Sequence, residues 1–99
     1  MRILLVKPGE SCETVEVENK LETLQKIVGG YIEAVALNEK TTLVCNEEGK
    51  VNGSMPNRIV RSKWLRDIIY GTFFLCGINK DDFGDIDYEE EKEWRKIFG

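Results

Sequence analysis

The first third of the chain carries two different periods of apolar residues. The segment 2–7 is rich in β-prone residues and ends at Pro8-Gly9, and the segment 14–18 alternates as TVEVE. Strict alternation is the pattern of a strand with one buried face. We therefore expect these two segments to pair as a hairpin.

A helical pattern follows directly. Leu21, Leu24 and Val28 recur at the spacing of one helical face. Asn19 is the expected N-terminal cap, with Glu22 as its capping-box partner. Gly29-Gly30 is the expected end of this helix, because glycine readily adopts the left-handed conformation that closes a helix.

The middle of the chain predicts a second hairpin. The segments 31–37 and 41–45 are rich in β-branched and aromatic residues, and the polar turn Asn38-Glu39-Lys40 separates them. Farther on, Val60, Trp64 and Ile68 share one helical face, but the segment 67–77, DIIYGTFFLCG, reads as a buried strand. Any helix before it must therefore be short, and Gly71 marks a bulge or a close backbone approach.

The end of the chain predicts a polar loop over 79–87 and then a last helix. Asp87 is the expected cap, and Tyr88, Trp94, Ile97 and Phe98 form the apolar side of the helix. The patterns together predict one domain over residues 1–99 of the α+β class. We expect a mixed or antiparallel sheet of roughly five strands, packed with two or three helices.

The longest polar segment is the predicted functional loop. Residues 46–58, NEEGKVNGSMPNR, contain no apolar run, and two glycines, Gly49 and Gly53, permit unusual backbone conformations. Long polar loops in small domains often bind ligands. The alternatives are structural: a Pro-Asn turn with an exposed Arg58, and a strand exit at Asn46 that turns at Gly49.

Composition restricts the class of function. The chain has 99 residues and a net charge of -4, and eight of its 18 acids fall within 81–93. Arg58, Arg61, Lys63 and Arg66 form a basic segment, which is too small for general nucleic-acid binding. The acidic segment fits a solvated helix start better than a calcium site or a DNA mimic.

The sequence also lacks several residue types and segments that particular functions require. The sequence has no histidine, so the usual base of a nucleophile triad is missing, and we expect no enzyme, cofactor or metal. Three widely spaced cysteines fit a reducing compartment. No segment has the length of a signal sequence or a membrane span, so we expect a cytoplasmic protein with no membrane contact.

Three segments, VGGYIEAVAL, LVCNEEGKVNGSMPNR and DIIYGTFFLCG, resemble a family of small domains of unknown function. The resemblance covers nearly the whole chain. That family is common in phages and mobile elements of Gram-positive bacteria, and it has no known catalytic motif. The resemblance therefore implies a phage context, in which several unrelated small folds form oligomers that sequester nucleotide signals of host immunity.

These observations give one functional hypothesis and one alternative. The hypothesis is a non-catalytic homo-oligomer that sequesters a small anionic, nucleotide-type host immune signal. Arg58 and Arg61 would neutralise phosphate, Asn57 would contact a base or sugar edge, and Tyr31 or Trp64 would cover a base. The alternative is an acidic protein that uses 89–93 to bind and inhibit a host enzyme. The full set of expected ligand residues is Tyr31, Asn46, Glu47, Asn57, Arg58, Arg61, Trp64 and Thr72.

Overall fold

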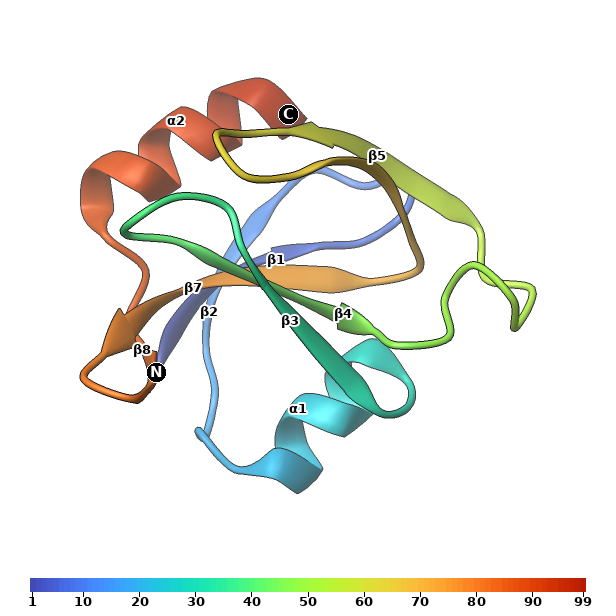
Figure 1. The fold of residues 1–99 in the computed structure, drawn as a ribbon, viewed down its shortest axis with the longest axis horizontal. Coiled ribbons are helices and arrows are strands. Elements are labelled where there is room, and N and C mark those ends of the chain that lie inside the picture. The colour runs from blue at the N-terminus through green and yellow to red at the C-terminus, as the bar shows by residue number, and fades with distance from the viewer.

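Two sheets and two helices make up the fold, which a computed structural model describes for residues 1–99 (Figure 1). Six strands form the main sheet, in the order β2-β1-β7-β4-β3 with β8 paired to β7, and β5 and β6 form a separate two-stranded hairpin. Every pairing is antiparallel. The elements are β1 (Arg2–Val6), β2 (Glu13–Glu16), α1 (Leu21–Val28), β3 (Ile32–Ala36), β4 (Thr42–Asn46), β5 (Pro56–Arg61), β6 (Arg66–Tyr70), β7 (Phe73–Asn79), β8 (Asp82–Gly84) and α2 (Tyr88–Phe98).

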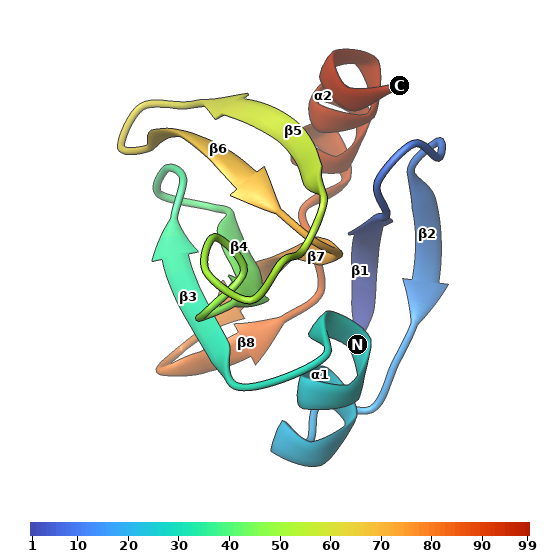
Figure 2. The ribbon, with the colours of Figure 1, turned by 90° about the vertical axis from the view of Figure 1, so that its right-hand side faces the viewer.

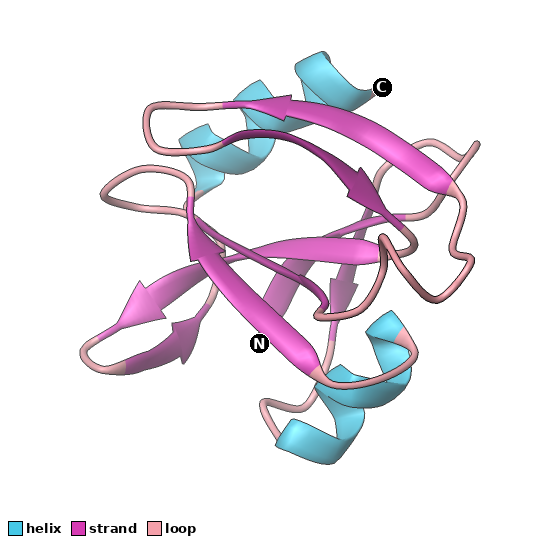
Figure 3. Ribbon diagram, turned by 45° about the vertical axis from the view of Figure 1, so that its right-hand side comes forward, coloured by secondary structure: helices cyan, strands magenta, loops and turns pink.

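The main sheet has one hydrophobic core on each face. Along β7, Phe73 and Leu75 belong to the core under the β5–β6 hairpin and α2, while Phe74 and Cys76 belong to the core under α1. This alternation follows from the period of two in a strand. Figure 3 shows α1 below the sheet, with the hairpin and α2 above it.

The α+β prediction is confirmed, and so are both predicted hairpins, now β1–β2 and β3–β4. Gly29 ends α1 in the left-handed conformation, with φ of 81°. Asp87 caps α2 by accepting hydrogen bonds from the backbone N–H groups of Glu89 and Glu90. The strands number eight rather than about five, because 56–70 forms a hairpin and the acidic loop contains β8.

The predicted cap of the first helix is wrong. The cap is Lys20, and no side chain bonds there, because Asn19 Nδ2 instead donates to the carbonyl of Phe83 at 3.1 Å. Asn19 therefore ties the start of α1 to β8.

No helix forms near Trp64, where the sequence allowed at most a short one; the segment is a hairpin instead. Val60 of β5 and Ile69 of β6 are buried, while the paired residues Ile59 and Ile68 are exposed on the opposite face of the hairpin. The predicted strand over 67–77 is interrupted at Gly71, whose φ is 78°, so its two halves join different sheets. No helix in the structure is long and apolar enough to cross a membrane.

Candidate functional site

The expected ligand residues lie in several separate places. Asn46 and Glu47 line a cavity beside β6. Asn57 and Arg58 are in β5 rather than in a loop. Arg61 and Trp64 lie at the far end of the β5–β6 hairpin, while Tyr31 precedes β3 and Thr72 precedes β7.

The cavity beside β6 has a volume of about 290 Å³ and an acidic lining. Its charged residues are Glu33, Glu47, Glu48, Asp67 and Lys50. The single cation, Lys50, lies 2.7 Å from an Asp67 oxygen. That hydrogen bond lowers the pKa of Asp67 and raises the pKa of Lys50. The lining is therefore unfavourable for an anionic ligand.

The Cys45 thiol also lies in the wall of this cavity. Burial, followed by the negative charges of Glu33 and Asp67, raises its pKa to about 11. A thiol with such a pKa is almost entirely protonated at neutral pH and is a poor nucleophile. The structure contains no group of three or more His, Cys, Asp or Glu side chains that could hold a metal ion.

Two asparagines of the predicted loop, Asn46 and Asn57, bond backbone groups of other residues in the chain. Asn46 Nδ2 donates to the Val28 carbonyl at 3.1 Å, and Asn46 Oδ1 accepts from the Glu48 N–H at 2.8 Å. Asn57 Nδ2 donates to the carbonyls of Val6 and Gly71 at 2.9 and 2.8 Å, which places Asn57 close to Thr72. These amides hold strands and turns in place.

Arg58 has the same kind of role. Its Nε donates to the carbonyl of Phe98 at 3.1 Å, its Nη1 donates to Asn57 Oδ1 at 2.9 Å, and its Nη2 donates to the carbonyl of Glu10. The guanidinium group therefore joins the end of α2 to the turn after β1. In this arrangement most of its donors already have acceptors.

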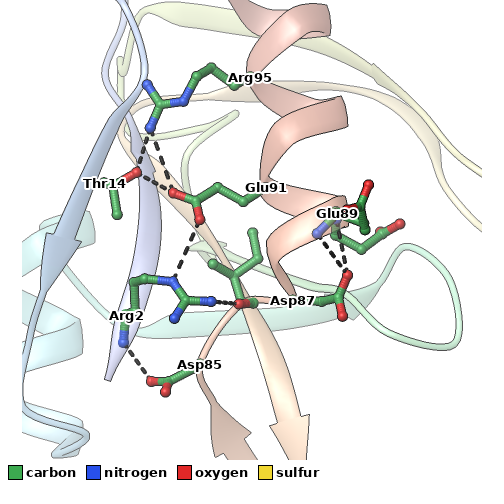
Figure 4. A network of polar contacts seen from close by, with 9 residues as sticks. Arg2, Thr14, Asp85, Asp87, Glu89, Glu91 and Arg95 are labelled. Atoms are coloured by element: carbon green, nitrogen blue, oxygen red, sulfur yellow. Dashed lines mark hydrogen bonds and ion pairs between the residues drawn. The ribbon is translucent and has the colours of Figure 1, made fainter.

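A second polar cluster lies where α2 meets β1 and β2 (Figure 4). Glu91, whose side chain is 13% exposed, forms ion pairs with Arg2 at 3.5 Å and with Arg95 at 3.6 Å. The hydroxyl of Thr14 also donates to Glu91. The Arg2 guanidinium stacks 3.9 Å from the centre of the Tyr88 ring. Arg2 Nε is buried without a hydrogen bond and meets Glu91 only as an ion pair, while the other contacts of the cluster lie within the chain, so we interpret it as a structural joint.

The acidic segment is partly engaged in the same way. Glu90 Oε1 accepts from Asn38 Nδ2 at 2.7 Å and from the Thr41 hydroxyl at 2.6 Å. Glu90 and Glu91 thus face their own chain. No observation adds support to the alternative that 89–93 binds a host enzyme, which stays a prediction.

The remaining place is the end of the β5–β6 hairpin, residues 61–66, which we call the hairpin tip. Ser62 and Leu65 close the turn, with a 2.8 Å bond from the Ser62 N–H to the Leu65 carbonyl. The Trp64 N–H donates to the Leu37 carbonyl at 3.2 Å, so the tip rests on the turn between β3 and β4. Figure 2 shows the tip above that turn.

The hairpin tip carries three cations and one exposed aromatic ring. Arg61 and Arg66 are directly paired across the two strands, and both are exposed. Neither forms a hydrogen bond or an ion pair through its side chain. Lys63 pairs with Glu39 and lies 5.5 Å from the centre of the Trp64 ring, which is 54% exposed.

Arg66 was missing from the expected ligand residues. In the sequence it is five residues from Arg61, a spacing that indicates no contact by itself. Only the strand register of the hairpin places the two side by side. A recognised β5–β6 hairpin would have revealed the pair.

One protein family matches the chain over residues 1–99, a domain of unknown function named DUF3846, and the chain belongs to this family. No curated protein and no solved structure shows significant similarity to it. The family assignment agrees with the resemblance to a domain of unknown function, and it shows neither a phage context nor an activity.

Proposed function

We propose that this DUF3846 protein is a non-catalytic binding protein that sequesters a small anionic ligand of the nucleotide type at the hairpin tip. The observation that carries the proposal is the direct pairing of Arg61 with Arg66 without any acidic partner. Like charges placed opposite each other on neighbouring strands destabilise a hairpin. A bound anion removes that repulsion.

The chemistry of the tip fits a phosphate attached to a base. Guanidinium groups bind phosphate oxygens in bidentate geometry, and two of them on adjacent strands can share one phosphate or bridge two. Trp64 offers an exposed ring for stacking with a base, which contributes about 1–3 kcal/mol. The proposal keeps the nucleotide-type ligand expected from the sequence but moves its site from the 46–58 loop to 61–66.

The biological role rests on the family resemblance. If the gene is carried by a phage, removal of a host nucleotide signal would protect the phage without any catalysis. A sequestering protein needs an affinity close to the concentration of its ligand, and a Kd of about 10 nM corresponds to roughly -11 kcal/mol.

A calorimetric screen of cyclic and ADP-ribose-type nucleotides tests the proposal. We expect one nucleotide to bind the wild type and to be recovered unchanged after denaturation of the protein. Arg61→Ala and Arg66→Ala should each weaken binding at least tenfold, and Arg61→Lys should weaken it less because it keeps the charge but loses the bidentate fork.

The matched control is Lys7→Ala. Lys7 is exposed, its side chain has no hydrogen-bond or ion-pair partner, and it is far from the tip in sequence. It should leave the affinity unchanged. The absence of any binding nucleotide, or binding that is indifferent to Arg61 and Arg66, contradicts the proposal.

A further inference from the structure

The β3 edge of the main sheet has unpaired backbone groups. The Glu47 N–H donates to the Tyr31 carbonyl at 2.9 Å, and the Leu37 N–H donates to the Thr41 carbonyl at 2.8 Å. In an antiparallel pair, hydrogen-bonded residues alternate with residues whose N–H and C=O point away from the partner strand. Since 31 and 37 bond to the β4 side, Ile32, Ala34 and Ala36 direct their backbone groups outward.

At the opposite edge of the sheet, distant residues bond the backbone of Cys12, just before β2, and contact the Thr14 side chain of β2. The Val17 N–H donates to the Met1 carbonyl at 2.9 Å, so by the same alternation Thr14 and Cys12 face outward. The Cys12 N–H donates to the Gly99 carbonyl at 2.7 Å, and Arg95 Nη1 donates to the Cys12 carbonyl at 3.0 Å. Figure 4 shows Arg95 and Glu91 of α2 reaching Thr14.

Nothing comparable protects β3. Figure 2 shows it at the outer side of the sheet with no element beyond it. Proteins usually block an open edge with lysine, proline, a bulge or a covering segment. The strand has the sequence IEAVA, whose single charge is Glu33, and its pairing with β4 is regular along its whole length.

We propose that a second copy of this chain pairs its own β3 with this edge, antiparallel, about a two-fold axis that passes beside Ala34. In this register Ala34 faces Ala34 of the second copy, and Ile32 faces Ala36. Every outward N–H of Ile32, Ala34 and Ala36 then meets an outward C=O of the other copy. A shift of two residues in either direction leaves some of these groups unpaired.

The side chains also fit this symmetric register. Glu33 comes opposite Val35 of the second copy, so the two carboxylates do not face each other. Ala34 meets another alanine, which leaves room for close approach of the strands. Identical surfaces that complement each other about a two-fold axis are the commonest basis of homodimers. A second copy is therefore the occupant that pairs all the outward backbone groups without placing the two Glu33 carboxylates directly opposite each other.

The dimer has a consequence for the hairpin tip, and this part rests on the proposed function. Continuing the register places Tyr31 opposite Leu37 of the second copy, with Cα atoms about 5 Å apart. The Leu37 carbonyl is the group that holds the Trp64 N–H. Tyr31 lies an even number of residues from Leu37, so by strand alternation its side chain shares the sheet face that the hairpin covers.

Each copy would thus contribute an aromatic ring to the other copy's site. Tyr31 is 69% exposed in the single chain and has no side-chain hydrogen bond. In the dimer it lies near Trp64 of the second copy, whose N–H is bonded to the Leu37 carbonyl. A base held between two rings loses more contact with water than a base on one ring.

Sedimentation of charge variants tests the symmetry. Only a residue beside the two-fold axis faces itself, so Ala34→Lys and Ala34→Glu should each raise the dimer Kd roughly fivefold or more. An equimolar mixture of the two variants should restore association. Ala36→Lys is the matched control, since it faces Ile32 and should have a smaller effect with no rescue by Ala36→Glu.

Amide exchange gives an independent measurement. The amides of Ile32, Ala34 and Ala36 should become protected as the protein concentration rises, while those of Glu33 and Val35, which bond to β4, should be protected at every concentration. A strict monomer near millimolar concentration overturns the proposal, and so does a dimer that lacks the Ala34 rescue or the added protection.

The contribution of Tyr31 is tested separately by nucleotide calorimetry. Tyr31→Ala should weaken binding to the wild-type dimer but not to the Ala34→Lys monomer. An affinity that does not depend on Tyr31 overturns its place in the site. If no nucleotide binds while the Ala34 results hold, the proposed function fails and the dimer stands.

Discussion

The two edge strands of the main sheet, β2 and β3, differ in whether other segments of the chain contact them. Just before β2, the Gly99 carbonyl and the Arg95 guanidinium group bond the backbone of Cys12, and Glu91 and Arg95 contact the side-chain hydroxyl of Thr14 in β2. At β3, no segment of the chain does the same. Small size alone therefore does not explain the open β3 edge, because at the β2 edge residues from distant parts of the chain bond Cys12 and Thr14.

The cover of β2 extends to Arg58. Its bonds to the carbonyls of Phe98 and Glu10 fasten the last turn of α2 beside the start of β2. The covering residues, Arg58, Glu91, Arg95 and Gly99, therefore act together on one edge. Substituting these residues one at a time measures how much each one contributes to holding α2 against the β2 edge.

The largest effect is expected for Glu91→Ala. The change leaves the Arg2 guanidinium, 16% exposed, without its carboxylate, and it removes an acceptor from Thr14 and Arg95. Loss of one partner of a buried ion pair costs about 3–5 kcal/mol, and the residual exposure here reduces the expected loss to about 2–3 kcal/mol in the free energy of unfolding.

Urea denaturation measures this loss. The control is Glu93→Ala on the same helix, because Glu93 is 60% exposed and pairs with Lys96 at the surface. It should cost less than about 0.5 kcal/mol. Equal effects of the two changes would mean that Glu91 does not hold the cover in place.

Arg58→Ala should have the next largest effect, about 1–2 kcal/mol of unfolding free energy. It removes charge-assisted hydrogen bonds to two backbone carbonyls and frees the end of α2 from the turn after β1. Amide exchange at Cys12 should become faster in the same variant. A large loss of nucleotide affinity in Arg58→Ala with unchanged stability would return Arg58 to the ligand site expected from the sequence.

Arg61→Ala should stabilise the protein slightly, by about 0.2–1 kcal/mol, because it removes the repulsion with Arg66. The gain should shrink at high salt, which screens exposed charges. Arg61→Lys is the control and should give no gain. Destabilisation by Arg61→Ala in the absence of ligand would show that this side chain has an internal partner after all.

The smallest expected effect is a difference in alkylation rate among the three cysteine thiols of the unmodified protein. Burial raises the pKa of all three cysteines, to about 11 for Cys45 and about 12 for Cys76, whereas Arg58 and Arg95 partly oppose the rise at Cys12. A raised pKa reduces the reactive thiolate at a given pH. Iodoacetamide labelling near pH 9, followed by mass spectrometry, should therefore modify Cys12 first and Cys76 last. Faster labelling of Cys76 would contradict this order.

Much of the fold was predictable because its signals are local. The alternation at 14–18, the glycines after Val28 and the capping position of Asp87 each depend on a few neighbouring residues. The β5–β6 hairpin was missed because Val60, Trp64 and Ile68 are spaced by four, which fits one face of a helix and one face of a strand equally well. The residues between these three positions, not their spacing, decide whether the segment forms a helix or a strand.

The candidate site was less predictable because it depends on contacts between distant residues. Composition placed Arg58 and Arg61 in one basic segment, but it did not show that Arg58 donates to Phe98 and Glu10 while Arg61 has no partner. The open edge was likewise hidden, because it follows from the strand order β2-β1-β7-β4-β3. No local pattern around β3 reveals that order.

The place of β7 in that order sets a limit on how the protein folds during synthesis. The hairpins β1–β2 and β3–β4 form from local segments, yet they join only through β7, which bonds to β1 on one side and to β4 on the other. Residues 73–79 leave the ribosome after about three quarters of the chain. Until then the nascent chain holds two hairpins without a common sheet, and their apolar faces must be shielded by other means or remain at risk of aggregation.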